Sequence, residues 1–155
     1  MDDLSLKLRR TQPEAVYEAV ITKDGKLTLP EGCFTDKTGD AFVVTKSFEE
    51  EVIWIFPMDS YDIVRTNLSK MNSIDPKVRM IRRRIIAEAV PVETDEKRQI
   101  ELLSEFMAIL GFDMDQDDSN TGLPVMLLMY PDKIEVASIK AYKTIVEELK
   151  KQQEE

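Results

Sequence analysis

The order of elements in the first half of the chain recurs in its second half. Three pairs of segments align: 17–27 with 90–100, 42–45 with 125–128, and 58–61 with 139–142. Few residues are identical, so the similarity lies in the order strand, charged turn, strand, short helix, apolar strand, turn, strand, helix. A repeated strand-rich order of this kind is typical of a pseudo-symmetric binding protein rather than of one catalytic pocket.

The length and hydrophobic content of the chain limit which kinds of fold it can form. The chain has 155 residues, of which 43% are hydrophobic, so it can bury a core in one compact domain or two intertwined ones. No run approaches the roughly 18 apolar residues of a membrane helix, and the sequence starts with two aspartates rather than a signal sequence. We therefore expect a soluble, cytosolic protein with no membrane partner.

Charge and side-chain chemistry argue against several functions. With 21 basic and 30 acidic residues the net charge is −9, which argues against a protein that coats DNA non-specifically. The single cysteine, Cys33, excludes an internal disulfide, and without histidine there is no zinc site to build. No nucleophile motif is present either, so we expect no cofactor, no metal and no enzyme.

Local patterns predict the elements of the first half. The Asp24-Gly25 pair is a hairpin-turn signal, and Glu49-Glu50-Glu51 forms an acidic turn between two strands that are apolar enough to be covered on both faces. The expected strands are residues 16–21, 26–29, 41–45 and 52–56, and the expected helix is 58–68.

A bridging helix and a second set of elements follow. Asp75 is a plausible N-cap with Pro76 at the first helical position, and the apolar stripe of this helix runs to about Ala89. The second half predicts strands at 90–93, 99–102, 125–130 and 134–137, and helices at 104–110 and 139–150. We divide the chain into a first module at 16–68, a linker helix at 69–89, a second module at 90–142 and a charged helix end at 143–155. Residues 1–15 remain unassigned.

Four segments in this order resemble the MraZ family of bacterial proteins. They are residues 25–30, 39–46, 75–89 and 132–136, and the resemblance extends from about residue 17 to 142. It implies a β-rich α+β fold of two tandem swapped-hairpin modules of the SpoVT/AbrB type, packed as a pseudo-twofold unit that assembles into homo-oligomeric rings. It also implies transcription regulation in the cytoplasm and nucleoid, by binding double-stranded DNA at repeated promoter elements of division and cell-wall genes.

The family's DNA-reading motif is an Asp-x-x-x-Arg turn, once per module, commonly with glycine before the arginine. The first copy here has Thr22 at the Asp position and Lys26 at the Arg position, and keeps Gly25. The second copy keeps the aspartate, but arginine replaces the glycine and glutamine the arginine. Its motif positions are Asp95, Arg98 and Gln99. By this resemblance the expected DNA-binding residues are Lys23, Lys26, Lys97, Arg98 and Gln99.

These replacements change what each turn can recognise. Arginine offers a planar fork to guanine or phosphate, whereas Lys26 supplies a point charge. Gln99 can pair with adenine but contributes nothing to counterion release. Asp24, Asp95 and Glu96 dilute the positive charge of the turns. The alternative function is therefore a degenerate MraZ-like scaffold that has lost DNA binding and acts through protein partners. A sequestering, antitoxin-like partner is a third and weaker reading.

Three other clusters have competing interpretations. The arginines at 82–84, with Lys77 and Arg79, spread over more than half of a helix at roughly 100° per residue, which favours a solvated or subunit-facing surface over a DNA contact. The aromatic residues Phe42, Phe48, Trp54 and Phe56 could stack bases, but core packing is favoured. An acidic segment suggests a calcium loop, yet its expected glycine and glutamate positions hold Asp118 and Pro124, so an acidic loop is favoured. Its oxygen-bearing residues are Asp113, Asp115, Asp117, Asp118 and Asn120.

Overall fold

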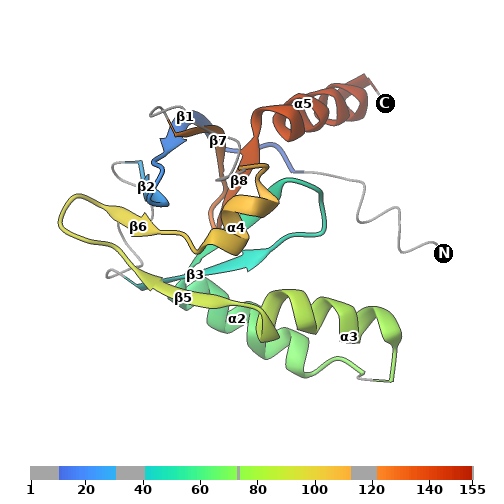
Figure 1. The fold of residues 1–155 in the computed structure, drawn as a ribbon. Helices are drawn as coiled ribbons and strands as arrows, with labels where there is room; N and C mark the ends of the chain where they lie inside the picture. Colours follow the sequence, from blue (N-terminus) through green and yellow to red (C-terminus); the bar gives the residue numbers. More distant parts are fainter. Residues whose placement is uncertain (1–10, 31–40, 73, 113–121, 155) are drawn as a thin grey trace.

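The computed structural model describes residues 11–30, 41–72, 74–112 and 122–154. Its strands form an antiparallel six-stranded sheet and a separate two-stranded ladder (Figure 1). The strands are β1 (Ala15–Ile21), β2 (Lys26–Thr28), β3 (Ala41–Lys46), β4 (Val52–Pro57), β5 (Val90–Glu93), β6 (Gln99–Glu101), β7 (Leu123–Met129) and β8 (Ile134–Ser138). Cys33 and the acidic segment considered for calcium lie outside the described residues.

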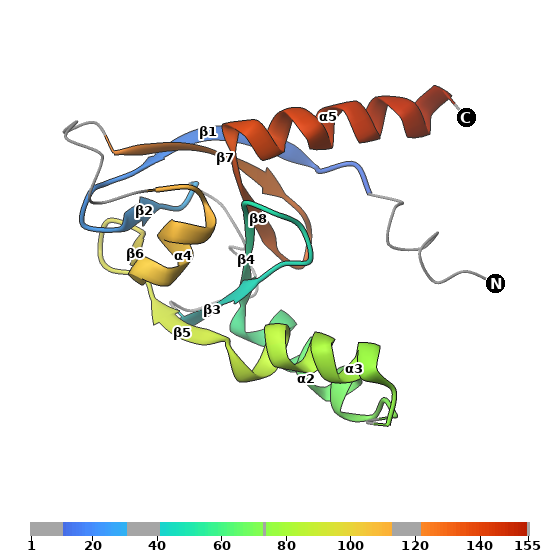
Figure 2. The same cartoon turned by 45° about the vertical axis from the view of Figure 1, so that its right-hand side comes forward.

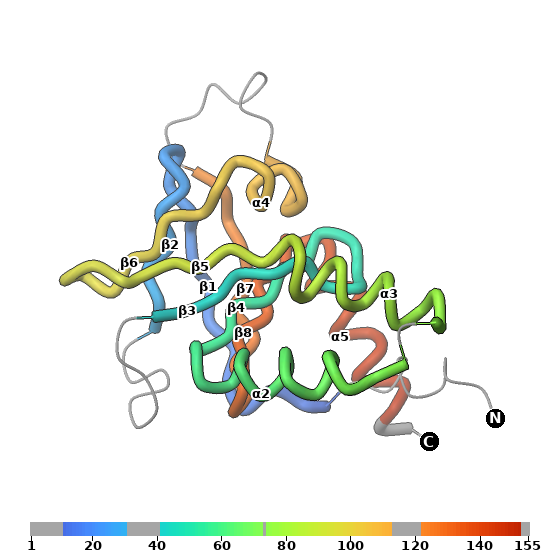
Figure 3. The backbone as a smooth tube through the Cα atoms, turned by 90° about the horizontal axis from the view of Figure 1, so that it is seen from below, coloured from blue at the N-terminus to red at the C-terminus, as the bar shows by residue number. Residues whose placement is uncertain are grey.

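The helices cover the two faces of the sheet. They are α2 (Met58–Ser69), α3 (Pro76–Arg82), the π-helical turn η1 (Arg83–Ala87), α4 (Ser104–Ile109) and α5 (Ile139–Glu154). Figure 2 shows α4 beside the β2–β6 ladder, with α5 crossing the other side of the molecule. In Figure 3 the chain leaves β4 into α2 and returns through α3 and η1 to β5.

Alternation along the strands divides the core into layers. In β4, Ile53 and Ile55 join the main cluster with the β2–β6 ladder and α4, whereas Val52 packs under α5 and Phe56 under α2 and η1. Successive side chains of a strand point to opposite faces, so both faces of this central strand are covered. In β3, Phe42 and Val44 join the main cluster and Val43 packs with Phe56, so the prediction that both strands of this hairpin are covered on both faces is confirmed.

The sheet is symmetric with respect to the two halves of the chain. When each strand is replaced by its counterpart in the other half, the same strand order is obtained from the opposite edge. The sheet order is β1-β7-β8-β4-β3-β5, so the first-half strand β1 pairs with β7 and its counterpart β5 pairs with β3. Ala19 faces Val125, and Phe42 faces Val92. Ala19 and Val92 are 73 positions apart and Phe42 and Val125 are 83 apart, the same offsets at which the halves align in sequence.

Two strand pairs lie on the approximate twofold axis of this exchange. In the small ladder Leu27 pairs with its own counterpart Ile100, and both side chains are almost completely buried. In the large sheet Trp54 pairs with Glu135, and the Trp54 Nε1 donates a 2.9 Å hydrogen bond to the Glu135 carboxylate. A buried carboxylate needs such a donor because burial without one is costly.

Element boundaries follow the sequence patterns closely, with two differences. The Asp75 side chain accepts a 2.9 Å hydrogen bond from the Lys77 amide, and Pro76 opens α3, which confirms the predicted cap. The bridging helix widens into η1, where the Glu88 amide donates to the Arg83 carbonyl five residues earlier. Helix α5 also continues to Glu154, beyond the predicted end at 150.

Candidate functional site

The first turn, residues 22–26, is closed by three hydrogen bonds. The Thr22 amide donates to the Lys26 carbonyl at 3.0 Å, and the Gly25 amide donates to the Thr22 carbonyl at 2.9 Å. The Lys26 amide donates to the Thr22 hydroxyl at 3.0 Å. Threonine at the position where the family motif has aspartate therefore still supplies an oxygen that holds the turn.

The second turn, residues 95–99, uses the same hydrogen bonds at equivalent positions. The Asp95 amide donates to the Gln99 carbonyl, and the Arg98 amide donates to the Asp95 carbonyl, both at 3.0 Å. The Asp95 carboxylate accepts from the Gln99 amide at 2.9 Å and from the Lys97 amide at 2.8 Å. Asp95 thus performs the role of Thr22 with one further bond.

Both turns contain one residue in the left-handed backbone region, and the opposite half of the chain holds it. Gly25 has φ +83° and Arg98 has φ +61°. The Leu102 amide donates to the Gly25 carbonyl at 2.7 Å, and the Leu29 amide donates to the Arg98 carbonyl at 2.9 Å. Sequence reasoning did not single out Leu29 and Leu102, although they share the offset of 73 positions. We call these two bonds the reciprocal clamp.

The β2–β6 ladder places the two turns close together. Lys26 at the start of β2 faces Glu101 at the end of β6, and Thr28 faces Gln99. The turns therefore leave a three-residue ladder at its two opposite ends, and their innermost residues, Lys26 and Gln99, are about 7 Å apart along its strands. One short ladder thus carries both turns (Figure 1).

The electrostatics of the turns reflect this proximity. The hydrogen bond from the Gln99 amide lowers the pKa of Asp95, and the Lys97 amide and the charges of Lys26 and Lys97 act in the same direction, while partial desolvation opposes them. The Lys26 contribution comes from the other turn. Asp95 is therefore a carboxylate at neutral pH, and its charge offsets part of the positive charge that Lys26 would present to an anion.

The predicted DNA-binding side chains differ in how freely they face solvent. Lys26, Lys97 and Arg98 are exposed, whereas Lys23 and Gln99 are half-buried. The Gln99 side-chain amide donates to the Thr28 hydroxyl at 3.3 Å, which occupies one of its donors. In the turns, four cations face three carboxylates, namely Asp24, Asp95 and Glu96, and Glu101 stands opposite Lys26.

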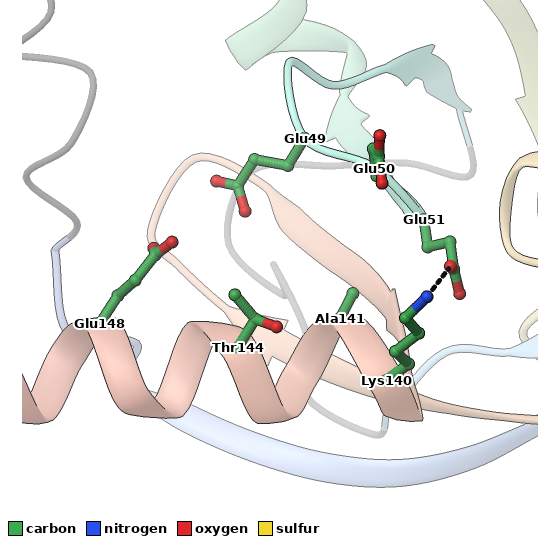
Figure 4. Close-up of a pocket in the computed structure, with 7 residues that line it drawn as sticks. All are labelled: Glu49, Glu50, Glu51, Lys140, Ala141, Thr144 and Glu148. Carbon is green, nitrogen blue, oxygen red and sulfur yellow. Dashed lines mark ion pairs between the residues drawn. The ribbon is translucent and has the colours of Figure 1, made fainter.

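A separate hollow at the β3–β4 turn is strongly acidic. It has a volume of about 270 Å³ and is lined by Glu49, Glu50, Glu51, Lys140, Ala141, Thr144 and Glu148. Figure 4 shows Lys140 reaching Glu51, at 3.9 Å, with other carboxylates around the rim. This turn lies on the opposite side of the molecule from the loop between β5 and β6 (Figures 1 and 2). Part of the chain's negative charge is therefore held away from the two turns.

Two of the three consecutive arginines stabilise the fold. Arg82 donates from Nε to the Leu68 carbonyl at 2.9 Å and from its terminal nitrogen to the carbonyls of Ser69, at 3.2 Å, and Met71. Arg84 donates to the Ser47 carbonyl at 2.8 Å. Their partners are backbone carbonyls, and both side chains are half-buried, so these two residues tie α3 and η1 to α2 and to the end of β3. Arg83 is exposed.

The aromatic residues divide between core and surface. Phe42 and Phe56 are buried in the core, as predicted, while Phe48 is 41% exposed and packs edge-on to Trp54 at 5.4 Å between ring centroids. Lys133 Nζ lies 5.3 Å from the Trp54 ring centroid. These rings form no open platform of stacked faces for bases.

The described residues contain neither a metal-ligand cluster nor a membrane-spanning helix. Among residues 11–30, 41–72, 74–112 and 122–154, no group of three or more cysteine or acidic side chains is arranged to hold a metal ion. Within the same part of the chain, no helix is both long enough and apolar enough to cross a membrane.

The fold and the paired turns define a strand-rich α+β protein whose two halves pair their strands with one another. No family model matches the chain. A transcriptional regulator MraZ from Thermomicrobium roseum is 30% identical over 97 residues, which span 63% of this chain and 67% of that protein. The chain belongs to the MraZ family.

The close approach of the Leu102 carbonyl predicts a specific requirement for glycine at position 25. A Cβ there would lie 2.6 Å from the Leu102 carbonyl oxygen, whereas a Cβ at Gly111, also at positive φ (+95°), would meet only a glutamate side chain at 3.5 Å. Both Gly→Ala substitutions incur the left-handed cost of about 1 kcal/mol. We expect Gly25→Ala to lower the free energy of unfolding in urea by at least about 1 kcal/mol more than Gly111→Ala does. Equal losses would show that the close approach at Gly25 is not a constraint.

Proposed function

We propose that this protein is a DNA-binding transcriptional regulator that contacts DNA through the first and second turns. The observation that carries the proposal is the shared design of the turns, which have equivalent hydrogen bonds and one left-handed residue each and stand at the two ends of one ladder. The relative from Thermomicrobium roseum is a transcriptional regulator rather than an enzyme, which agrees with this class.

The exposed cations of the turns supply the DNA contacts in this proposal. Lys26 holds a phosphate as a point charge, and Arg98 can make two parallel hydrogen bonds to a phosphate or to guanine. Lys23 and Lys97 add charge beside them. Gln99 is the remaining base-reading candidate, through adenine, and must release Thr28 to use its amide fully.

Each turn taken alone binds weakly in this scheme, so assembly multiplies the contacts. We propose tandem swapped-hairpin modules of the SpoVT/AbrB type at 16–68 and 90–142, joined by the segment 69–89, as a pseudo-twofold unit. Copies of this unit form a homo-oligomeric ring in the cytoplasm, associated with the nucleoid. Several turns then engage repeated promoter elements of division and cell-wall genes through effective concentration.

The distribution of charge supports this orientation. The chain carries a net charge of −9, which disfavours DNA overall. However, the hollow lined by Glu49, Glu50, Glu51 and Glu148 lies on the opposite side of the molecule from the loop between β5 and β6, which forms the second turn (Figures 1 and 2). Salt screens distant charges most, so in this proposal the local charge balance at the turns matters more for DNA binding than the net charge does.

A matched pair of charge deletions tests the assignment of the turns. Lys26 and Arg83 are both exposed cations, and only Lys26 lies in a turn. We expect Lys26→Ala to weaken binding to DNA carrying the repeats upstream of the chain's own gene by about 1 kcal/mol per engaged turn, and to make the salt slope shallower by about 1. Arg83→Ala should leave both unchanged. Equal losses in fluorescence-anisotropy titrations at several salt concentrations would refute the assignment.

A scaffold without DNA binding is the second candidate function. It is favoured by the near-balance of charge at the turns and by the absence of a complete Asp-x-x-x-Arg pattern in either of them. In this reading the turn framework is retained for folding, while protein partners replace DNA. In that case the surface of the two turns binds a protein instead of DNA.

Restoring the second turn separates the two candidates. In Arg98→Gly/Gln99→Arg, glycine suits the φ of +61° at position 98, and arginine restores the bidentate fork. If the turn faces DNA, affinity should rise by about 1 kcal/mol per engaged turn. Arg98→Gly alone is the control, because it removes the Arg98 contact and relaxes the backbone without adding a fork at position 99, so the double variant should bind more tightly than this single variant. A double variant that folds and assembles normally but gains no affinity for any repeated promoter sequence would favour the scaffold.

A further inference from the structure

Strand β1 presents an apolar edge. It is the terminal strand of the six-stranded sheet, and among the described residues β7 is its only partner within that sheet. Val16, Tyr17 and Val20 are 38%, 45% and 51% exposed. A seven-residue edge strand with apolar side chains and neither lysine nor proline is a template for an added strand.

The opposite edge of the sheet is protected. Strand β5, the counterpart of β1, has only four residues and carries Pro91 at the position equivalent to Glu18. Proline has no amide hydrogen to donate to an added strand. Of the two edges, β1 is therefore the one suited to accept another strand.

A hollow runs along β1 and reaches the second turn. It has a volume of about 360 Å³, and its lining includes Tyr17, Ala19, Leu29, Pro30 and Arg98. Alternation along the strand puts Tyr17 and Ala19 on one side of β1 and Glu18 and Val20 on the other, and all four residues line the hollow. An added strand with apolar residues on one face and cations on the other fits this edge, because its apolar row would lie beside Tyr17 and Ala19 and its cations beside Glu18.

The chain itself contains such a segment. Residues 4–8 read Leu-Ser-Leu-Lys-Leu and are followed by Arg9 and Arg10, so leucines alternate with polar residues at a period of two. Residues 4–10 number seven, as do those of β1. Lys7 and Arg9 fall on the face opposite the leucines, where they can pair with Glu18.

The path of the following residues directs this segment to a second copy. The Thr11 carbonyl accepts a 3.1 Å hydrogen bond from the Tyr130 hydroxyl, and the Glu14 amide donates to the Met129 carbonyl at 2.8 Å. Residues 11–14 are thus already held along the end of β7. A return of residues 4–10 onto their own β1 would have to reverse the chain within these four residues.

We propose that residues 4–10 of one copy add as a strand to the β1 edge of another copy. This exchange rests on the self-association in the proposed function and names the contact that produces it. Because the hollow includes Arg98, the exchanged segment lies behind the second turn of the neighbouring copy. Assembly and the shape of that turn are therefore linked.

Disulfide trapping between two differently substituted proteins tests the exchange. One protein carries Leu4→Cys, Leu6→Cys or Leu8→Cys and the other carries Tyr17→Cys, each in the full chain with Cys33→Ser. After mixing and mild oxidation, we expect at least one of the three mixtures to give a heterodimer joined through position 17, identified by peptide mass. As a control, Ile63→Cys replaces Tyr17→Cys, because Ile63 is 63% exposed and lies on α2. The heterodimer yield with Tyr17→Cys should be at least five times the yield with this control.

Each outcome of the trapping experiment decides between alternatives. A heterodimer yield no higher than that of the Ile63→Cys control would overturn the exchange. So would a cross-link that forms only within a single chain carrying both cysteines. If light scattering still gives a mass several times 17.8 kDa and promoter DNA still binds, the proposed function stands without this contact. A chain that forms the heterodimer but binds no promoter DNA would overturn the proposed function and leave the exchange standing.

Discussion

The reciprocal clamp is the constraint on which the arrangement of the two turns depends. Each half of the chain contributes a left-handed residue, Gly25 or Arg98, and the other half supplies the amide, Leu102 or Leu29, that holds its carbonyl. Each turn is therefore closed by bonds within its own half and held in place by a bond from the opposite half. The Leu27–Ile100 pair buries the centre of the ladder between the turns, so burial and hydrogen bonding fix the same geometry.

This constraint separates the framework of the turns from their surface. Thr22 and Asp95 close equivalent turns with different oxygens, and positions 25 and 98 share a backbone conformation with different side chains. Lys26 and Gln99 can therefore diverge from arginine while the turn keeps its shape. A family member can in this way retain the fold and alter what its turns recognise, which is the choice between the two candidate functions.

Much of the local structure could be predicted from the sequence, but the pairing between the halves could not. Periodicity, the Asp24-Gly25 signal and the Asp75-Pro76 cap predicted element positions, because these depend on neighbouring residues. The β1–β7 pair joins residues about 100 positions apart, and the period of a strand does not specify its partner. The carbonyl contacts of Arg82 and Arg84 and the hollow beside Arg98 arise from that long-range packing, so no local pattern indicated them.

Hydrogen–deuterium exchange with and without DNA carrying the repeats upstream of the chain's own gene reports whether both turns contact DNA as one paired unit. We expect slower exchange in peptides that cover residues 22–28 and 95–101, in both halves together, and no change in α5, which lies away from the ladder. Protection that omits both turns, or that falls on α2 and α3 instead, would show that the turns are not the DNA-binding surface.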